Sequence, residues 1–214
     1  MSSDAVSQDV GVVVVVDDSS SMGVDGRSEI LAQRLKDTQD FYTRACGDCN
    51  ITLRFSSVVF KEGVEVKGIV PELTPEALGL SPGGNGNLSY ALTNTVTQVT
   101  DRFPASVGYC FVVVFTNAAQ NPPATGELES LKHRIAKRSQ QEPWELFSLK
   151  FVTIGKNNPG AMQTVLEALD MPREHCIHFN SHHPSGSPSE SPTSTTSSPV
   201  GFAAATRRGF RRES

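Results

Sequence analysis

The sequence predicts an α/β fold in which a doubly wound, mostly parallel sheet carries helices on both faces. Two observations lead to this prediction. Residues 12–16 are an unbroken run of valines, which is typical of a central strand that is buried on both faces. Further along the chain, strand-like apolar segments alternate with segments of helical periodicity, and this alternation indicates parallel strands joined by helical crossovers.

The first half of the chain is predicted to continue with one helix and two antiparallel strands. Residues 28–45 have apolar side chains at near-helical spacing, with Glu29 early and Arg44 late, as the helix dipole prefers. The segments 51–60 and 64–70 are strand-like and only three residues separate them. We therefore expect an antiparallel pair whose second strand lies at an edge of the sheet.

The second half of the chain is predicted to alternate between helices and strands. The expected elements are a helix at 88–103, a strand at 109–115, a basic amphipathic helix at 127–139, a strand at 147–154, a helix at 161–169 and a last strand at 176–179. From residue 181 the composition changes to Ser, Pro, Thr and Gly, which cannot bury enough apolar surface to form a core. We therefore expect one domain over residues 1–180 and a disordered tail with a basic C-terminus over 181–214.

The composition excludes several classes of protein. The chain has 214 residues, a net charge of -4 and a pI near 5.7, which argues against a nucleic-acid-binding protein because such proteins usually carry a basic surface. No run of apolar residues approaches the length of a membrane span, and the first residues do not resemble a secretory signal. Four cysteines in a chain of this length do not suggest a disulfide framework. We expect a cytoplasmic protein, with the nucleus as the other compartment.

Acidic and hydroxyl side chains follow the first predicted strand. Ligands of doubly wound sheets bind beyond the carboxyl ends of the strands. Because side chains alternate as the chain leaves the strand, Asp17, Ser19 and Ser21 are expected to face one point. Asp18 and Ser20 are expected to face away. One carboxylate and two hydroxyls suit Mg²⁺ or Mn²⁺, whereas zinc prefers nitrogen and sulfur. The same residues would also serve as caps of the loop and of the first helix, and the residues alone leave both interpretations open.

The segment D-D-S-S-S-M resembles the D-x-S-x-S motif of von Willebrand factor A (VWA) domains. The resemblance extends over about residues 9–180. It includes P-G-G-N-G-N-L-S-Y-A-L before a helix and V-V-V-F-T-N-A after a strand. It implies a Rossmann-like sandwich with a metal-ion-dependent adhesion site (MIDAS), in which the motif is joined by a threonine from a second loop and an aspartate from a third. In the family, a carboxylate of the bound protein completes the coordination of the ion, which implies adhesion or complex assembly.

The second and third loops depart from the family pattern. Gly86, between Asn85 and Asn87, stands where the family has its threonine. In the third loop, Thr116 and Asn117 stand where the family has threonine and aspartate, so a neutral amide replaces one carboxylate. Because Mg²⁺ normally needs carboxylate charge, metal binding is expected to be weaker than in the family. The metal ligands that the resemblance implies are Asp17, Ser19, Ser21 and Asn117.

Other functional classes fit the sequence less well. A receiver domain needs an aspartate after its third strand, but no aspartate lies between Asp48 and Asp101. The loop G-G-N-G-N lacks the lysine and spacing of a P-loop, and the serines lack the G-x-S-x-G context of a hydrolase nucleophile. Cys46 and Cys49, with the His-Cys-x-His segment at 175–178, have zinc-like spacing. The predicted topology separates these two groups across the sheet, so ordinary packing is the preferred interpretation.

These observations predict a non-enzymatic protein-binding domain with a partial MIDAS-type site for Mg²⁺ or Mn²⁺. The expected partner is a protein that completes the site with an acidic side chain, and no nucleic acid or membrane is expected to bind. The alternative function is a metal-independent assembly scaffold in which the site is vestigial.

Overall fold

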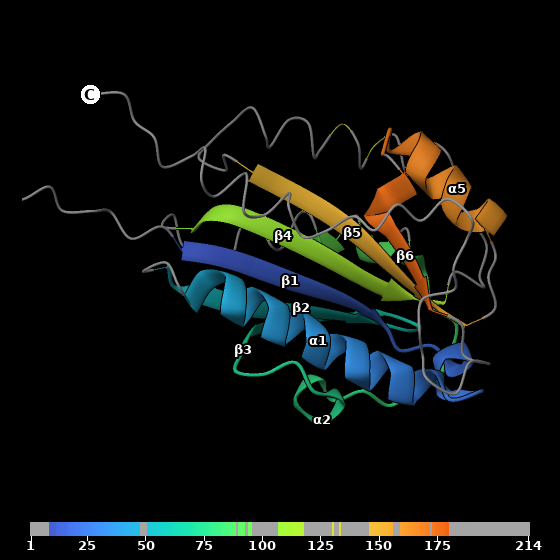
Figure 1. The fold of residues 1–214 in the computed structure, drawn as a ribbon. Coiled ribbons are helices and arrows are strands. Elements are labelled where there is room, and N and C mark those ends of the chain that lie inside the picture. The colour runs from blue at the N-terminus through green and yellow to red at the C-terminus, as the bar shows by residue number, and fades with distance from the viewer. Residues whose placement is uncertain are drawn as a thin grey trace, which may run out of the picture.

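The computed structural model describes residues 9–47, 51–88, 90–92, 94–95, 107–117, 130, 133, 146–155, 159–171 and 173–179 (Figure 1). The tail predicted at 181–214 and most of the helix predicted at 127–139 lie outside the described residues.

The described strands form one six-stranded sheet in the order β3-β2-β1-β4-β5-β6. The strands are β1 (Asp9–Asp17), β2 (Leu53–Phe60), β3 (Val64–Val70), β4 (Val107–Thr116), β5 (Leu146–Ile154) and β6 (Cys176–Phe179). All neighbouring strands are parallel except β2 and β3, which are antiparallel. The predicted doubly wound, mostly parallel sheet is therefore confirmed, and β3 lies at an edge, as expected.

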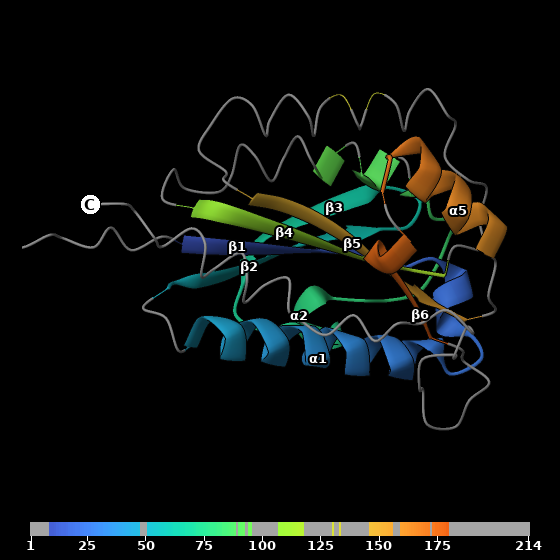
Figure 2. The same ribbon diagram turned by 45° about the horizontal axis from the view of Figure 1, so that its top comes forward.

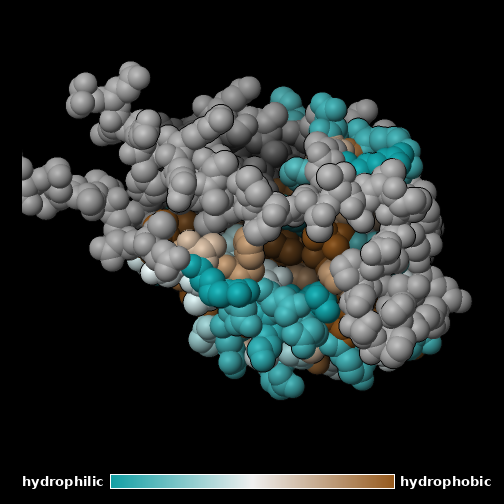
Figure 3. Space-filling model, in the orientation of Figure 1, coloured by the Kyte–Doolittle hydropathy of each residue, from teal (hydrophilic) through white to brown (hydrophobic). Residues whose placement is uncertain are grey.

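The helices lie on the two faces of this sheet. The described helices are α1 (Arg27–Gly47), α2 (Pro75–Leu78) and α5 (Pro159–Ala168), with short 3₁₀ turns η1 (Ser20–Gly23) and η2 (Arg173–His175). Figures 1 and 2 show α1 along one face and α5 on the opposite face. The outward side of α1 is hydrophilic in the space-filling view, and hydrophobic residues lie behind it (Figure 3).

The central strand β1 separates two hydrophobic cores. All nine of its residues are buried. Val12, Val14 and Val16 belong to the core beneath α1, whereas Val13 and Val15 belong to the core on the α5 face. Full burial of one such side chain stabilises the fold by about 1.5–3 kcal/mol. The valine run thus forms a strand because every position, rather than every second one, meets apolar neighbours.

The helix α2 was not predicted, although its sequence carries a clear signal. The side chain of Thr74 accepts a hydrogen bond from the backbone nitrogen of Ala77 at 3.2 Å, and Pro75 is the first helical residue. Gly79 ends the helix with a left-handed φ of 62°. A four-residue helix is too short to show apolar periodicity, so only its capping residues identify it.

The described residues hold no zinc site of the kind that the spacing of cysteines and histidines allowed, and Cys49 lies outside the described residues. Cys46 is buried in the core beneath α1, and Cys176 lies on β6 at the far edge of the sheet from β2 and β3. Among the described residues, no three His, Cys, Asp or Glu side chains are grouped so that they could hold a metal ion. Within the same part of the chain, no helix is both long enough and apolar enough to cross a membrane.

Candidate functional site

The candidate site lies where the two central strands end. The strands β1 and β4 are parallel neighbours, and Val16 pairs with Phe115. The carboxyl ends of these two strands therefore lie side by side. This register places Asp17, at the end of β1, next to Thr116, at the end of β4.

Asp17 is a buried carboxylate that both loops hold in place. Its side chain is only 3% exposed. The Oδ1 atom accepts a hydrogen bond from the backbone nitrogen of Ser19 at 3.0 Å, and Oδ2 accepts one from the hydroxyl of Thr116 at 2.9 Å. Each carboxylate oxygen can accept about two hydrogen bonds, so each retains acceptor capacity beyond these contacts.

Ser21 connects the first loop to Asn117. The hydroxyls of Ser19 and Ser21 lie 2.9 Å apart, and the amide nitrogen of Asn117 donates to the Ser21 hydroxyl. Rotating the Asn117 amide by 180° exchanges its nitrogen and oxygen atoms. The carbonyl oxygen would then lie beside the Ser21 hydroxyl, where the nitrogen lies in this orientation. The four residues predicted as metal ligands, which include Asp17, thus form one hydrogen-bonded group.

Asp18 and Ser20 face away from this group, as the alternation of side chains predicted. Both carboxylate oxygens of Asp18 accept from the backbone nitrogen of Ser81, at 3.0 and 3.1 Å, and Oδ2 lies 3.2 Å from Nζ of Lys61. The hydroxyl of Ser20 donates to the carbonyl oxygen of Gly84 at 2.8 Å. These contacts join the first loop to the glycine-rich loop. Ser20 has no left-handed backbone, so its side chain causes no strain there.

The glycine-rich loop places Gly86 directly over Asp17. A Cβ atom at Gly86 would lie 3.0 Å from Oδ1 of Asp17 and 3.2 Å from Cε2 of Phe60. Gly86 therefore occupies the position from which a threonine side chain would reach the site, but a side chain there requires its neighbours to move by a few tenths of an ångström. Asn85 is exposed, and Asn87 accepts from the Tyr90 backbone nitrogen at 2.9 Å, so Asn87 acts as a helix cap.

The ligand atoms of this group are of the type that a hard divalent ion prefers, but together they carry little negative charge. Carboxylate, hydroxyl and amide oxygens are ligands that Mg²⁺ and Mn²⁺ accept. Within the group formed by Asp17, Ser19, Ser21 and Asn117, only Asp17 has a carboxyl group. A doubly charged ion held by one carboxylate would bind weakly.

Arg27 also contacts the first loop, and the sequence analysis did not single it out. Its Nη1 donates to the carbonyl oxygen of Ser21 at 2.6 Å, and its Nη2 lies 3.2 Å from Oδ2 of Asp25. The side chain packs against Gly155, at the end of β5. The available signal was a cation at the first position of a helix, where the helix dipole disfavours positive charge.

Comparisons with known proteins identify similar folds. No protein-family model matches the sequence, and no curated protein matches it. Proximal thread matrix protein 1 (PTMP1) from the mussel byssus is 17% identical with a TM-score of 0.58, over 81% of this chain and 44% of that chain. The SpRpn10 VWA domain is 16% identical with a TM-score of 0.55, over 80% of this chain and 86% of that chain.

A von Willebrand factor type A protein from Catenulispora acidiphila is 15% identical with a TM-score of 0.52, over 94% of this chain and 42% of that chain. The chain thus spans less than half the length of this protein and of PTMP1. A further structure of PTMP1 has a zinc-occupied MIDAS motif.

Proposed function

We propose that this chain, which has a von Willebrand factor A-like fold, is a non-enzymatic protein-binding domain that docks its partner at the carboxyl ends of β1 and β4. The proposed site is a weak, MIDAS-type site for Mg²⁺ or Mn²⁺, and an acidic side chain of the partner completes it.

The observation that carries this proposal is the convergence of oxygen-bearing side chains from two loops. Asp17, Ser19 and Ser21 come from the loop after β1, and Asn117 comes from the loop after β4, yet they form one hydrogen-bonded group. Capping of α1 alone does not account for this group, because none of these contacts goes to a backbone nitrogen of α1. The contacts instead join the two loops at the edge where doubly wound sheets bind ligands.

A bound divalent ion would supply a positive charge with an open coordination position for a partner's carboxylate. The residues that would hold it are Asp17, Ser19 and Ser21, together with Asn117 through its amide oxygen. The zinc-occupied MIDAS motif of PTMP1 supports the idea that this fold can hold a divalent ion. The role of this chain's own residues is to orient the oxygen atoms and to keep the Asp17 carboxylate buried.

The surroundings of the serines support binding rather than catalysis. A serine nucleophile needs a general base within hydrogen-bonding distance. The hydroxyls of Ser19 and Ser21 bond each other instead. The ring nitrogens of His175 and His178 lie within hydrogen-bonding distance of the Leu149 carbonyl oxygen and the Thr153 hydroxyl, at 2.9 and 2.8 Å, rather than of these serines.

One observation favours the second candidate function, a metal-independent assembly scaffold. The oxygens of Asp17 and the hydroxyl of Ser21 already have hydrogen-bond partners within the protein, so the group holds together without an ion. In such a scaffold the partner would bind through helix faces instead of these loops.

Calorimetric titration with Mg²⁺, Mn²⁺ and Ca²⁺ distinguishes the two functions. We expect the wild-type chain to bind Mn²⁺ or Mg²⁺ weakly and Asp17→Ala to abolish this binding, because Asp17 is the ionised ligand. Asp37→Ala removes a carboxylate that is 45% exposed on α1 and serves as the matched control, with unchanged binding. Absence of wild-type binding, or equal binding by Asp17→Ala, would overturn the proposed metal site.

A further inference from the structure

Arg27 is placed where physical chemistry disfavours a cation. It is the first residue of α1, a helix of 21 residues whose N-terminus carries the positive end of the helix dipole. The residue is nevertheless only 8% exposed. A buried charge is costly unless it is well paired, so this position needs an explanation beyond local stability.

The guanidinium of Arg27 is held tightly but is not fully paired. Nη1 donates to the Ser21 carbonyl oxygen at 2.6 Å, and Nη2 pairs with Asp25 at 3.2 Å. Nε is buried and has no hydrogen-bond partner among the described residues. A Cβ atom at Gly155 would lie 2.7 Å from this Nε, so the absence of a side chain at Gly155 gives Arg27 its space.

Asp25 is a poor permanent counterion for Arg27. Its side chain is 48% exposed, so solvent weakens the pairing. Its backbone has a left-handed φ of 56°, a conformation that costs a non-glycine residue about 1 kcal/mol or more. A carboxylate supplied by a partner could replace this exposed side chain at the guanidinium. The structure thus shows a carboxylate at Arg27 that comes from a half-exposed side chain and makes a single contact of 3.2 Å.

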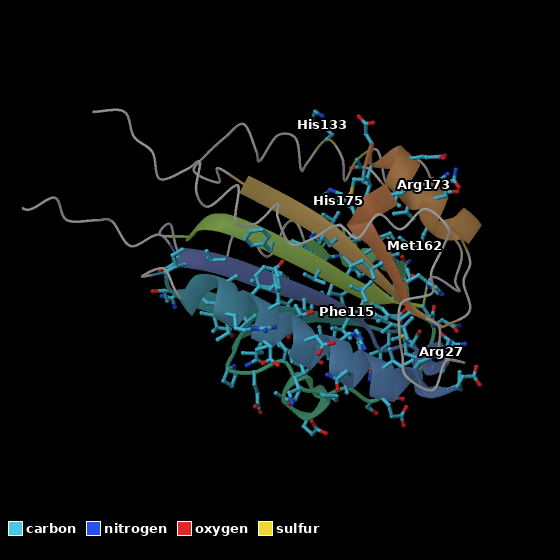
Figure 4. All side chains as sticks on the ribbon, in the orientation of Figure 1. Arg27, Phe115, His133, Met162, Arg173 and His175 are labelled. Carbon is cyan, nitrogen blue, oxygen red and sulfur yellow. The ribbon has the colours of Figure 1, made fainter. Side chains whose placement is uncertain are left out.

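We propose that Arg27 is a second anchor for the partner and receives a carboxylate from an acidic side chain, which displaces Asp25. This inference rests on the proposed function in one respect, that the partner docks at this edge of the sheet. Arg27 lies at the end of α1 beside the carboxyl ends of the strands (Figure 4). The dipole of α1 and the guanidinium both attract an anion at this point.

Ser21 links the two anchors. Its hydroxyl belongs to the group around Asp17, whereas its carbonyl oxygen accepts from Arg27. A carboxylate at Arg27 therefore lies beside the proposed ion but does not depend on it. A planar guanidinium matches a carboxylate through two parallel hydrogen bonds, which favours a carboxylate here over a neutral group.

The test uses the full chain in excess EDTA and a fluorescein-labelled hexaglutamate peptide, with binding read by anisotropy at low salt. We expect Asp25→Asn to bind the peptide at least fivefold more tightly than the wild type, because it frees Arg27. The matched control is Glu29→Gln, which removes an exposed acid from the same helical turn and should change binding less than twofold. Arg27→Gln should abolish binding in both the wild-type and Asp25→Asn backgrounds.

Arg27→Lys provides a second variant if Arg27→Gln does not fold. Lysine keeps the positive charge but cannot form the two parallel hydrogen bonds of the guanidinium, so this variant should bind the peptide at least fivefold more weakly than the wild type. Equal binding by the wild type and the Arg27 variants, an equal gain from Asp25→Asn and Glu29→Gln, or tighter binding of inorganic phosphate than of the peptide would overturn the proposal.

The failure of the metal site remains distinguishable from the failure of this proposal. Asp17→Ala should leave peptide binding in EDTA within twofold of the wild type, because no ion is involved. A protein that binds the peptide through Arg27 but binds no Mn²⁺ would contradict only the metal site. A protein that binds Mn²⁺ but not the peptide, even with Asp25→Asn, would contradict only the Arg27 anchor.

Discussion

Replacing Asp18 with alanine should weaken the attachment of the glycine-rich loop to the first loop and destabilise the fold. Asp18 is 1% exposed, and its carboxylate accepts from the Ser81 backbone nitrogen and pairs with Lys61. Loss of a hydrogen bond to a charged group costs about 1.5–3 kcal/mol. The Lys61 side chain is 43% exposed, so its pairing adds only about 0.2–1 kcal/mol.

The expected loss for Asp18→Ala is therefore about 2–4 kcal/mol, obtained from these two contacts. For a chain of this size, each kcal/mol lowers Tm by about 2–4 °C, so thermal unfolding should show a decrease of about 4–16 °C. Asp37→Ala is the matched control, because the Asp37 side chain is 45% exposed and pairs with Arg34 on the same helix, so its loss should change stability by less than about 0.5 kcal/mol. Equal Tm values for the two variants would refute the argument that Asp18 joins the loops.

Three further predictions concern the sheet and its edge. Val14→Asp should prevent folding, since Val14 is 0% exposed and the new carboxylate would have no partner; soluble protein with a cooperative transition would contradict this. Gly155→Ala should cost about 1–3 kcal/mol in chemical denaturation, because Gly155 has a φ of 118° and its Cβ would approach Arg27, whereas Gly63→Ala has open space and should cost less. Burial lowers the pKa of His178 below its ordinary value of 6.5, so folding favours the neutral ring. The contribution of His178 to the free energy of unfolding is fully present above pH 6.5, and it is lost as the pH falls from 6.5 toward the lowered pKa of the folded state. His178→Gln should therefore make the free energy of unfolding depend less on pH over this range. An unchanged pH profile would contradict this prediction.

The positions of the strands could be predicted from the sequence because their burial leaves a direct pattern. The valine run of β1 is apolar at every position, and β3 (Val64–Val70) and β6 (Cys176–Phe179) have the bounds that were predicted. The strands β1, β4 and β5 extend one to three residues beyond their predicted ends, and β2 begins two residues later than predicted. These differences arise because the apolar pattern and the backbone hydrogen bonding of a strand do not end at the same residue.

The arrangement of the site was predictable only in part. Alternation of side chains predicted that Asp17, Ser19 and Ser21 face one point. It did not predict the contact of Arg27 with the Ser21 carbonyl oxygen, because this contact depends on the path of the loop between them. Along that path Asp25 has a left-handed backbone with a φ of 56°, a conformation that residues other than glycine adopt uncommonly.

The approach of Gly86 to Asp17 likewise brings together residues that are far apart in the sequence. Local patterns do not specify how two loops pack against each other, and only the resemblance to VWA domains indicated that these loops meet. The zinc-like spacing of cysteines and histidines shows the converse, since the two described members Cys46 and Cys176 pack against different hydrophobic cores.

The central claim is that Asp17, Ser19, Ser21 and Asn117 form a divalent-ion site that is weak because it has only one carboxylate. Calorimetric titration of Asn117→Asp with Mn²⁺ tests this claim most directly. The second carboxylate should strengthen binding at least tenfold, which corresponds to about 1.4 kcal/mol, and adding Asp17→Ala should abolish the gain. A correctly folded Asn117→Asp protein that binds Mn²⁺ no more tightly than the wild type would contradict the claim.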